Sequence, residues 1–317
     1  VFPMIVAGTI WLPLLLLAIE LIISQRPLLG RSALVPWMCL GAVSIAMQLL
    51  AGHPEIIAYS IMVGVAYGAW RLAPLVFRRT VRPGRLILLM AALAGMLLLG
   101  ILLGAVQFVP QLEAANGNFR SEVASLDEVR GWGYPLRRLI TFLVPNFFGN
   151  PSHHGYFDLF TWQWTQASVN AWSDPIRTID WGIKNYVEGG SYVGILPLLL
   201  SGLGIWFAFH QRHVASRMWR SALFFGLLSL VCLAFVFGTR LYSFVYYLPG
   251  LSQLHTPFRW VWPFSLCIAV LASFGSEAMT RARIEQRSGE ISVACRRVAL
   301  GSLICGVLLM FGVIFGL

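Results

Sequence analysis

Long apolar runs separated by short polar connectors dominate the chain. A helix that crosses a bilayer needs about 20 mostly apolar residues, and by this rule about eight runs qualify as spanning helices. They cover residues 1–24, 32–52, 54–77, 86–109, 191–209, 221–239, 260–280 and 298–317. We therefore expect an all-α polytopic membrane protein with a single membrane domain over residues 1–317. Both ends of the sequence lie inside apolar runs, so we expect a fragment of a longer protein.

Arginines gather in alternate connectors, at residues 25–31, 78–85, 210–220 and 281–297. Basic loops remain on the cytoplasmic side of a membrane. These connectors are therefore predicted to be cytoplasmic, and residues 281–297 form a polar linker. The turn at 52–54, the loop at 111–190 and the connector at 240–259 are predicted to face outward.

Composition agrees with this pattern. Only 11% of the residues are charged, whereas a soluble domain carries about 25%. The net charge of +10 would suggest nucleic acid in a soluble protein. Here the arginines lie in membrane connectors, so no nucleic-acid partner is expected. Glu20 and Arg71 lie near the cytoplasmic ends of their helices, where long side chains can snorkel to the interface.

The loop at 111–190 differs from the rest because it is rich in acidic and aromatic residues. Loops of this length inside compact domains are usually functional or disordered, and the aromatic content argues against disorder. Residues 111–130 are expected to form an exposed helix or turn. Residues 134–145 are apolar but too short to span, which favours an interfacial or re-entrant helix. Arg137 and Arg138 at its start could snorkel to head groups or cradle a phosphorylated lipid.

Other residues of this loop leave alternatives open. Trp162, Trp164, Trp172 and Trp181 suit either an aromatic belt at the interface or a platform for sugar rings. His153, His154 and Asp158 only loosely resemble a metal site, so no metal ligand set is predicted, although a divalent metal ion stays open as a cofactor. The carboxylates that could act as bases are Asp158, Asp174, Asp180 and Glu188.

Two further groups lie at outward helix ends. Pro54 suits the first position of a helix, and Glu55 then lies in the first turn, where the helix dipole favours a carboxylate. With His53 this segment is either a capped turn or a substrate-facing acid. A second short interfacial helix is expected over residues 241–250. Arg259 opens the helix at 260–280, where a guanidinium anchors at the interface or binds phosphate bidentately.

Four segments occur together in a fixed order: Gly52-His-Pro-Glu55; Leu139-Ile-Thr-Phe-Leu-Val-Pro-Asn-Phe-Phe-Gly149, followed by Tyr156; Glu188-Gly-Gly-Ser-Tyr-Val-Gly-Ile-Leu-Pro-Leu-Leu-Leu200; and Leu248-Pro-Gly-Leu-Ser-Gln-Leu-His-Thr-Pro-Phe-Arg-Trp260. This pattern, over residues 36–275, resembles the YfhO family of bacterial membrane proteins, in the GT-C-like superfamily of membrane glycosyltransferases. The resemblance implies a multi-pass enzyme of the bacterial cytoplasmic (inner) membrane. It would pass sugar from a polyprenyl-phosphate donor to a cell-envelope acceptor on the outer face.

The resemblance also implies roles for single residues. Glu55 is the catalytic candidate, and the substrate-binding candidates are His53, Arg137, Arg138, Asp158, Glu188, Tyr192, His255 and Arg259. We expect His53, Glu55 and Arg259 to converge on one outward cavity. Superfamily members usually carry a catalytic Asp in the first outward loop, which we expect upstream of this fragment. The alternatives are a non-catalytic membrane subunit of a larger complex and a transporter of lipid or polysaccharide.

Overall fold

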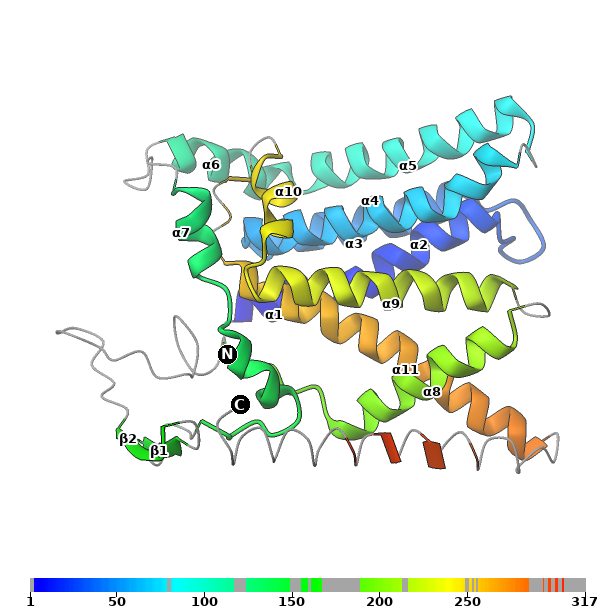
Figure 1. Ribbon diagram of the computed structural model, residues 1–317. Coiled ribbons are helices and arrows are strands. Elements are labelled where there is room, and N and C mark those ends of the chain that lie inside the picture. Colours follow the sequence, from blue (N-terminus) through cyan, green and yellow to red (C-terminus); the bar gives the residue numbers. More distant parts are fainter. Residues whose placement is uncertain are drawn as a thin grey trace. The chain divides into compact units, whose positions relative to one another are not determined.

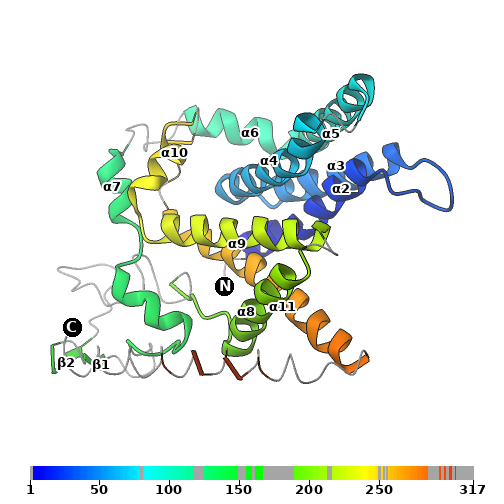
Figure 2. The same ribbon diagram turned by 45° about the vertical axis from the view of Figure 1, so that its right-hand side comes forward.

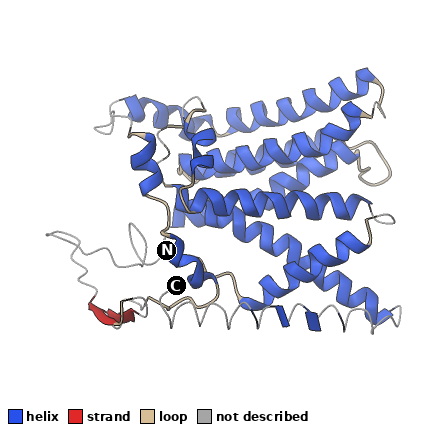
Figure 3. Ribbon diagram, viewed as in Figure 1, coloured by secondary structure: helices blue, strands red, loops and turns tan. Residues whose placement is uncertain are grey.

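The structure is a computed structural model, shown in Figure 1. It describes residues 3–78, 81–116, 124–148, 155–158, 161–166, 189–212, 216–248, 251–252, 254, 256–284, 293, 296–297, 300–301 and 304. These residues are mostly helical (Figure 3). Among them, five helices are long and apolar enough to cross a membrane, and two shorter apolar helices accompany them. The protein is therefore a helical membrane protein, as predicted.

The expected count of helices is only partly covered by these residues. The five long helices are Pro3–Ser24, Pro54–Phe77, Pro83–Leu103, Met218–Val236 and Pro257–Arg281, and the shorter pair is Leu34–Leu50 and Ile195–His210. The eighth predicted span, at residues 298–317, lies almost entirely outside the described residues. The chain forms two compact units, Val1–Ala124 with Leu248–Leu254 (unit 1) and Ser125–Tyr247 with His255–Leu317 (unit 2). The single membrane domain stays a prediction.

Unit 1 contains the helices α1 (Pro3–Thr9), α2 (Leu12–Ser24), α3 (Leu34–Leu50), α4 (Pro54–Phe77), α5 (Pro83–Leu103) and α6 (Ala105–Asn116). Proline begins α4 and α5, where its fixed φ suits the first helical position and its missing N–H costs nothing. The predicted start of a helix at Pro54 is confirmed. The first apolar run is broken at Ile10 and Trp11, just before Pro13 in the first turn of α2.

Glycines set the packing of α3 against α5. A Cβ added at Gly100 would lie 2.6 Å from the Cβ of Ile45, and one added at Gly104 would lie 2.6 Å from the Leu49 side chain. On α3 the reverse holds, because Gly41 accommodates the thioether of Met96. Small residues let membrane helices approach closely and gain van der Waals contact. This is why α3 packs more extensively on α5 than on α4, which lies between them in sequence.

The predicted helix at 86–109 is wrong in its boundaries. Helix α5 begins at Pro83 and ends at Leu103, and α6 continues to Asn116, inside the predicted long loop. Gly104 forms a turn between them, pressed against Leu49. The predicted loop at 111–190 therefore begins with part of a helix.

Contacts within unit 1 agree with the prediction that successive connectors lie alternately at the two ends of the helices. Gln111 Nε2 donates a hydrogen bond of 2.8 Å to the carbonyl of Gly52, so the predicted outer turn meets the start of the outer loop. Arg85 donates to the side chain of Gln25, so the basic connectors at 25–31 and 78–85 also meet. Figure 1 shows the α2–α3 and α4–α5 connectors at the same end of this helix group.

Unit 2 contains α7 (Leu126–Gly131), η1 (Leu136–Phe142), β1 (Gly155–Asp158), β2 (Gln163–Gln166), α8 (Ile195–His210), α9 (Ser216–Val236), η2 (Arg240–Tyr242), α10 (Ser243–Tyr246), η3 (Pro257–Trp260) and α11 (Val261–Ile284). Helix α8 crosses α11, which also packs on α9 (Figure 2). At the crossing, a Cβ on Gly204 would overlap the carbonyl oxygen of Leu271, and a Cβ on Gly275 would overlap that of Leu200.

The segments of unit 2 that are predicted to face outward differ from the prediction in detail. The interfacial helix expected at 134–145 is the 3₁₀-helix η1, and the one expected at 241–250 consists of η2 and α10. The antiparallel hairpin β1–β2, which pairs Gly155 with Gln166 and Asp158 with Gln163, was not predicted. Helix α11 also continues to Ile284, into the predicted linker at 281–297.

Candidate functional site

The first predicted group lies where α4 begins in unit 1. Gly52 has a φ of +75°, which glycine adopts without strain, and His53 then takes an extended conformation as the N-cap residue. Glu55 follows in the first turn and is only 8% exposed. The Tyr59 hydroxyl, one turn further along, donates a hydrogen bond of 3.2 Å to Glu55 Oε1. Residues four apart share a helix face, so Tyr59 orients this carboxylate.

The second group surrounds the start of η1 in unit 2. Arg138 is only 3% exposed, and its guanidinium lies 4.2 Å from the ring centroid of Tyr134. Its Nη2 donates a hydrogen bond to the carbonyl of Gly189. Next to it, the Thr141 and Ser191 hydroxyl oxygens lie 2.5 Å apart in a hydrogen bond. These contacts fix η1 against residues 189–191.

Arg137 has different surroundings. It is 40% exposed at the side chain, and its Nη1 lies 3.8 Å from Oδ2 of Asp158, whose side chain is 6% exposed. That distance makes an ion pair but exceeds a direct hydrogen bond. The Arg137 guanidinium also lies 5.6 Å from the ring centroid of Phe148. Arg137 thus presents an accessible cation that a buried carboxylate on β1 holds from one side.

Aromatic contacts anchor this region to the start of α11. Tyr134 stacks on Phe258 with ring centroids 5.7 Å apart, and Phe142 meets Phe264 edge to face at 5.3 Å. Arg259 directly follows Phe258 in η3 and is partly exposed. The predicted residues Arg137, Arg138, Asp158 and Arg259 therefore belong to one unit. Tyr134 connects Arg138 to η3.

The β1–β2 hairpin and its turn present two exposed tryptophans. Trp162 and Trp164 are 60% and 63% exposed. Trp162 has a φ of +54°, which is uncommon for a residue other than glycine, and its ring meets that of Phe157 edge to face. Trp164 pairs with Phe157, so both side chains lie on the hairpin face opposite to that of Asp158, which contacts Arg137.

The remaining predicted residues are not all covered. Tyr192 follows Ser191 and is 47% exposed. Glu188, His255, His153 and His154 lie outside the described residues. His53 and Glu55 belong to unit 1 and Arg259 to unit 2, so their convergence stays a prediction. Within the described part of the chain, no group of three or more His, Cys, Asp or Glu side chains could hold a metal ion.

The structure adds residues that the sequence reasoning missed. Tyr59 could have been found from its four-residue spacing to Glu55, whereas no local signal pairs Thr141 with Ser191. Glu20 and Arg71 were interpreted as snorkelling, but they form a bidentate ion pair of 2.6 and 2.7 Å between α2 and α4. The Tyr67 hydroxyl donates to the same carboxylate at 3.0 Å. Each of these charges is therefore paired with a residue of the neighbouring helix.

Comparisons with protein-family models, curated proteins and solved structures found no match for this chain. The resemblance to the YfhO family therefore stays a prediction from the residues quoted above.

Proposed function

We propose that this chain forms part of a YfhO-like membrane glycosyltransferase. It would have about eight spanning helices and would act at the outer face of a bacterial cytoplasmic membrane. It would take sugar from a polyprenyl-phosphate donor and pass it to a cell-envelope acceptor. The observation that carries this proposal is the exposed guanidinium of Arg137 beside Asp158 and the exposed Trp162 and Trp164.

The chemistry assigns different tasks to the arginines. As the acceptor hydroxyl attacks the anomeric carbon, the bond to the donor phosphate breaks and negative charge grows on the leaving phosphate. A guanidinium stabilises this charge with short, charge-assisted hydrogen bonds. Arg137 suits this task because its ion pair is long enough to be exchanged for a phosphate oxygen. Arg138 is buried against Tyr134 and Gly189, so it positions η1, and Arg259 is the further phosphate ligand.

The acceptor hydroxyl must also lose a proton. Glu55 assists this proton transfer in the proposal, since its carboxylate lies in the first turn of α4 and is oriented by the hydrogen bond from Tyr59. This role requires that the outward cavity bring His53 and Glu55 to the donor phosphate. Trp162 and Trp164 would stack on sugar rings through their broad, amphipathic faces.

Binding of polyprenyl phosphate tests this proposal. The purified chain in micelles is titrated with polyprenyl phosphate and, separately, with polyprenol, with tryptophan fluorescence as the signal. We expect saturable quenching by the phosphate only. Loss of a hydrogen bond to a charged group costs about 1.5–3 kcal/mol, so Arg137→Gln should weaken binding by at least about tenfold. Arg281→Gln is the matched control, because Arg281 is also partly exposed and ion-paired, to Glu277.

Two results would contradict the proposal. Equal affinity for polyprenol and polyprenyl phosphate would show that the chain has no phosphate site. Equal losses of affinity in Arg137→Gln and Arg281→Gln would show that Arg137 does not contact the phosphate. A chain that binds neither lipid would favour the non-catalytic subunit predicted as the alternative.

A further inference from the structure

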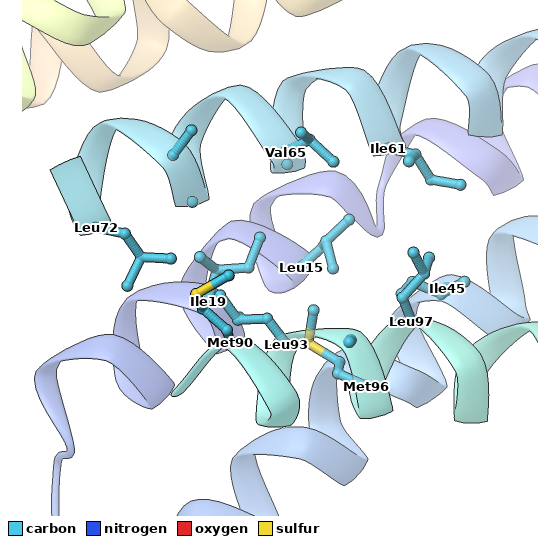
Figure 4. Close-up of a pocket in the computed structure, with 14 residues that line it drawn as sticks. Leu15, Ile19, Ile45, Ile61, Val65, Leu72, Met90, Leu93, Met96 and Leu97 are labelled. Carbon is cyan, nitrogen blue, oxygen red and sulfur yellow. The ribbon is translucent and has the colours of Figure 1, made fainter. Parts of the chain in front are cut away.

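Unit 1 contains an apolar groove between α4 and α5 that no predicted site uses (Figure 4). Its volume is about 320 Å³, within the range of sites that hold small molecules. Leu15 and Ile19 of α2 form its floor, and hydrocarbon or thioether side chains of α4 and α5 form its walls. It offers no polar side chain to a ligand, so only an apolar group suits it.

Small residues leave this space open. Gly68 and Ala69 of α4 and Ala94 of α5 line the groove. A Cβ added at Gly68 would meet no side-chain atom closer than 3.9 Å. Gly100 and Gly104 differ from it, because each closely accommodates a side chain of α3. The missing side chain at Gly68 therefore leaves an open space, whereas Gly100 and Gly104 are each filled by a side chain of α3.

The rim of the groove faces the surroundings of the helices. Val65 on α4 and Met90 on α5 are 62% and 55% exposed. Both helices are long and apolar enough to span a membrane, so this rim lies at the depth of lipid chains. Apolar cavities exclude water and bind apolar molecules, and the molecule available at this depth is a lipid chain.

Positive charge lies at one end of the groove. Arg78, Arg82 and Arg85 are exposed in and beside the connector from α4 to α5. At 1.5 Å per residue, Arg78 lies about 9 Å along α4 from Leu72 of the groove wall, and Arg85 lies about 7.5 Å along α5 from Met90. Arg85 also donates to Gln25. Basic sites between membrane helices on the cytoplasmic side bind anionic lipid head groups.

We propose that this groove binds one acyl chain of an anionic phospholipid, whose phosphate lies among Arg78, Arg82 and Arg85. The groove's basic end is the end of α4 opposite to Glu55. The lipid would therefore belong to the leaflet opposite the donor and would be a separate ligand. This proposal does not depend on the transferase activity.

Photo-crosslinking in nanodiscs tests the site. The full chain is reconstituted with phosphatidylglycerol that carries a diazirine in the middle of one acyl chain, and labelled peptides are located by mass spectrometry. We expect Val65 and Met90 to be labelled more strongly than Leu230 of α9, which is 63% exposed but lines no described groove. Phosphatidylcholine with the same diazirine chain serves as the zwitterionic comparison.

Variants separate the groove from the charges. Gly68→Leu should fill the groove and abolish the excess labelling, and Ala69→Trp does so from an exposed position if the first variant folds poorly. Gly226→Leu on α9 is the matched control, because a Cβ there meets nothing within 4 Å. Each arginine near a membrane surface changes the affinity for anionic lipid about fivefold. Arg78→Gln, Arg82→Gln and Arg85→Gln together should therefore reduce phosphatidylglycerol labelling to the phosphatidylcholine level.

Three results would overturn the inference. Uniform labelling of exposed apolar residues would mean ordinary bulk lipid. Equal labelling of the wild-type chain by phosphatidylglycerol and phosphatidylcholine would show that the site does not recognise an anionic head group. Absence of label from the groove in a folded chain would mean that another part of the protein or a second copy covers it.

Discussion

The crossing of α8 and α11 gives a sharp prediction, because two glycines contact the backbone of the opposite helix. In Gly275→Ala, the new methyl group would overlap the Leu200 carbonyl oxygen, and in Gly204→Ala it would overlap that of Leu271. A flexible side chain could rotate away from an added methyl group, but a backbone carbonyl cannot. The helices must separate, and all contacts along the crossing weaken with them.

The size of the effect follows from two opposing terms. Overpacking a close contact costs about 1–3 kcal/mol, and alanine gains up to about 1 kcal/mol over glycine in helix propensity. Because the backbone carbonyl cannot move aside, the overpacking cost lies at about 2–3 kcal/mol, and subtracting about 1 kcal/mol of helix propensity leaves a loss of about 1–2 kcal/mol of unfolding free energy for each single variant. The double variant should lose less than the sum, because separation caused by one methyl group also makes room for the other.

Buried thiols provide the assay. Cys267 on α11 and Cys232 on α9 are fully buried, so a thiol-reactive dye reports the opening of unit 2 during heating. Cys39→Ser, Cys295→Ser and Cys305→Ser remove the other thiols. A loss of 1–2 kcal/mol lowers the midpoint by about 2–8 °C for a unit of this size.

Gly202→Ala is the control, because Gly202 lies on α8 like Gly204. A Cβ at Gly202 meets nothing within 4 Å, so this variant should unfold at the wild-type temperature or slightly above it. The reasoning is refuted if Gly275→Ala leaves the midpoint unchanged, or if Gly202→Ala lowers it equally.

Two further predictions concern charged residues. Arg71→Gln should destabilise unit 1 by about 1–3 kcal/mol in thermal unfolding, less than a fully buried pair because Glu20 is 27% exposed. Adding Glu20→Gln should recover part of the loss, and an equal or greater loss would contradict the pairing. If His53 and Arg259 face one cavity, as the proposed function requires, His53→Cys and Arg259→Cys together should cross-link with a short bifunctional thiol reagent on a background without other cysteines. The absence of this cross-link in folded protein would exclude the shared cavity.

Several features of the fold could be predicted because they depend on local sequence. The start of α4 follows from Pro54, and the membrane helices follow from apolar runs. The turn at Gly104, which lies against Leu49 of another helix, was not predicted. The hairpin was missed although Tyr156, Phe157, Trp164 and Thr165 supply the aromatic and β-branched residues typical of strands.

The candidate site shows the same division. The two arginines near the start of η1 were visible in the sequence, but the difference in their burial was not. Arg138 is buried because Tyr134 and Gly189 surround it, whereas its neighbour Arg137 remains exposed. This difference arises from residues about 50 positions apart in the chain. The pairing of Glu20 with Arg71 was missed for the same reason.

The glycine-lined contact between α3 and α5 has a consequence for how the chain is made. Helix α4 leaves the ribosome before α5, yet α3 finds its more extensive partner surface on α5. Helix α3 therefore emerges from the ribosome before Gly100 and Gly104, which form the docking positions for Ile45 and Leu49. Until α5 arrives, that face of α3 is covered only by lipid or by the insertion machinery itself. Membrane insertion and helix assembly in unit 1 are thus separate events, with completion of α5 as the step that joins them.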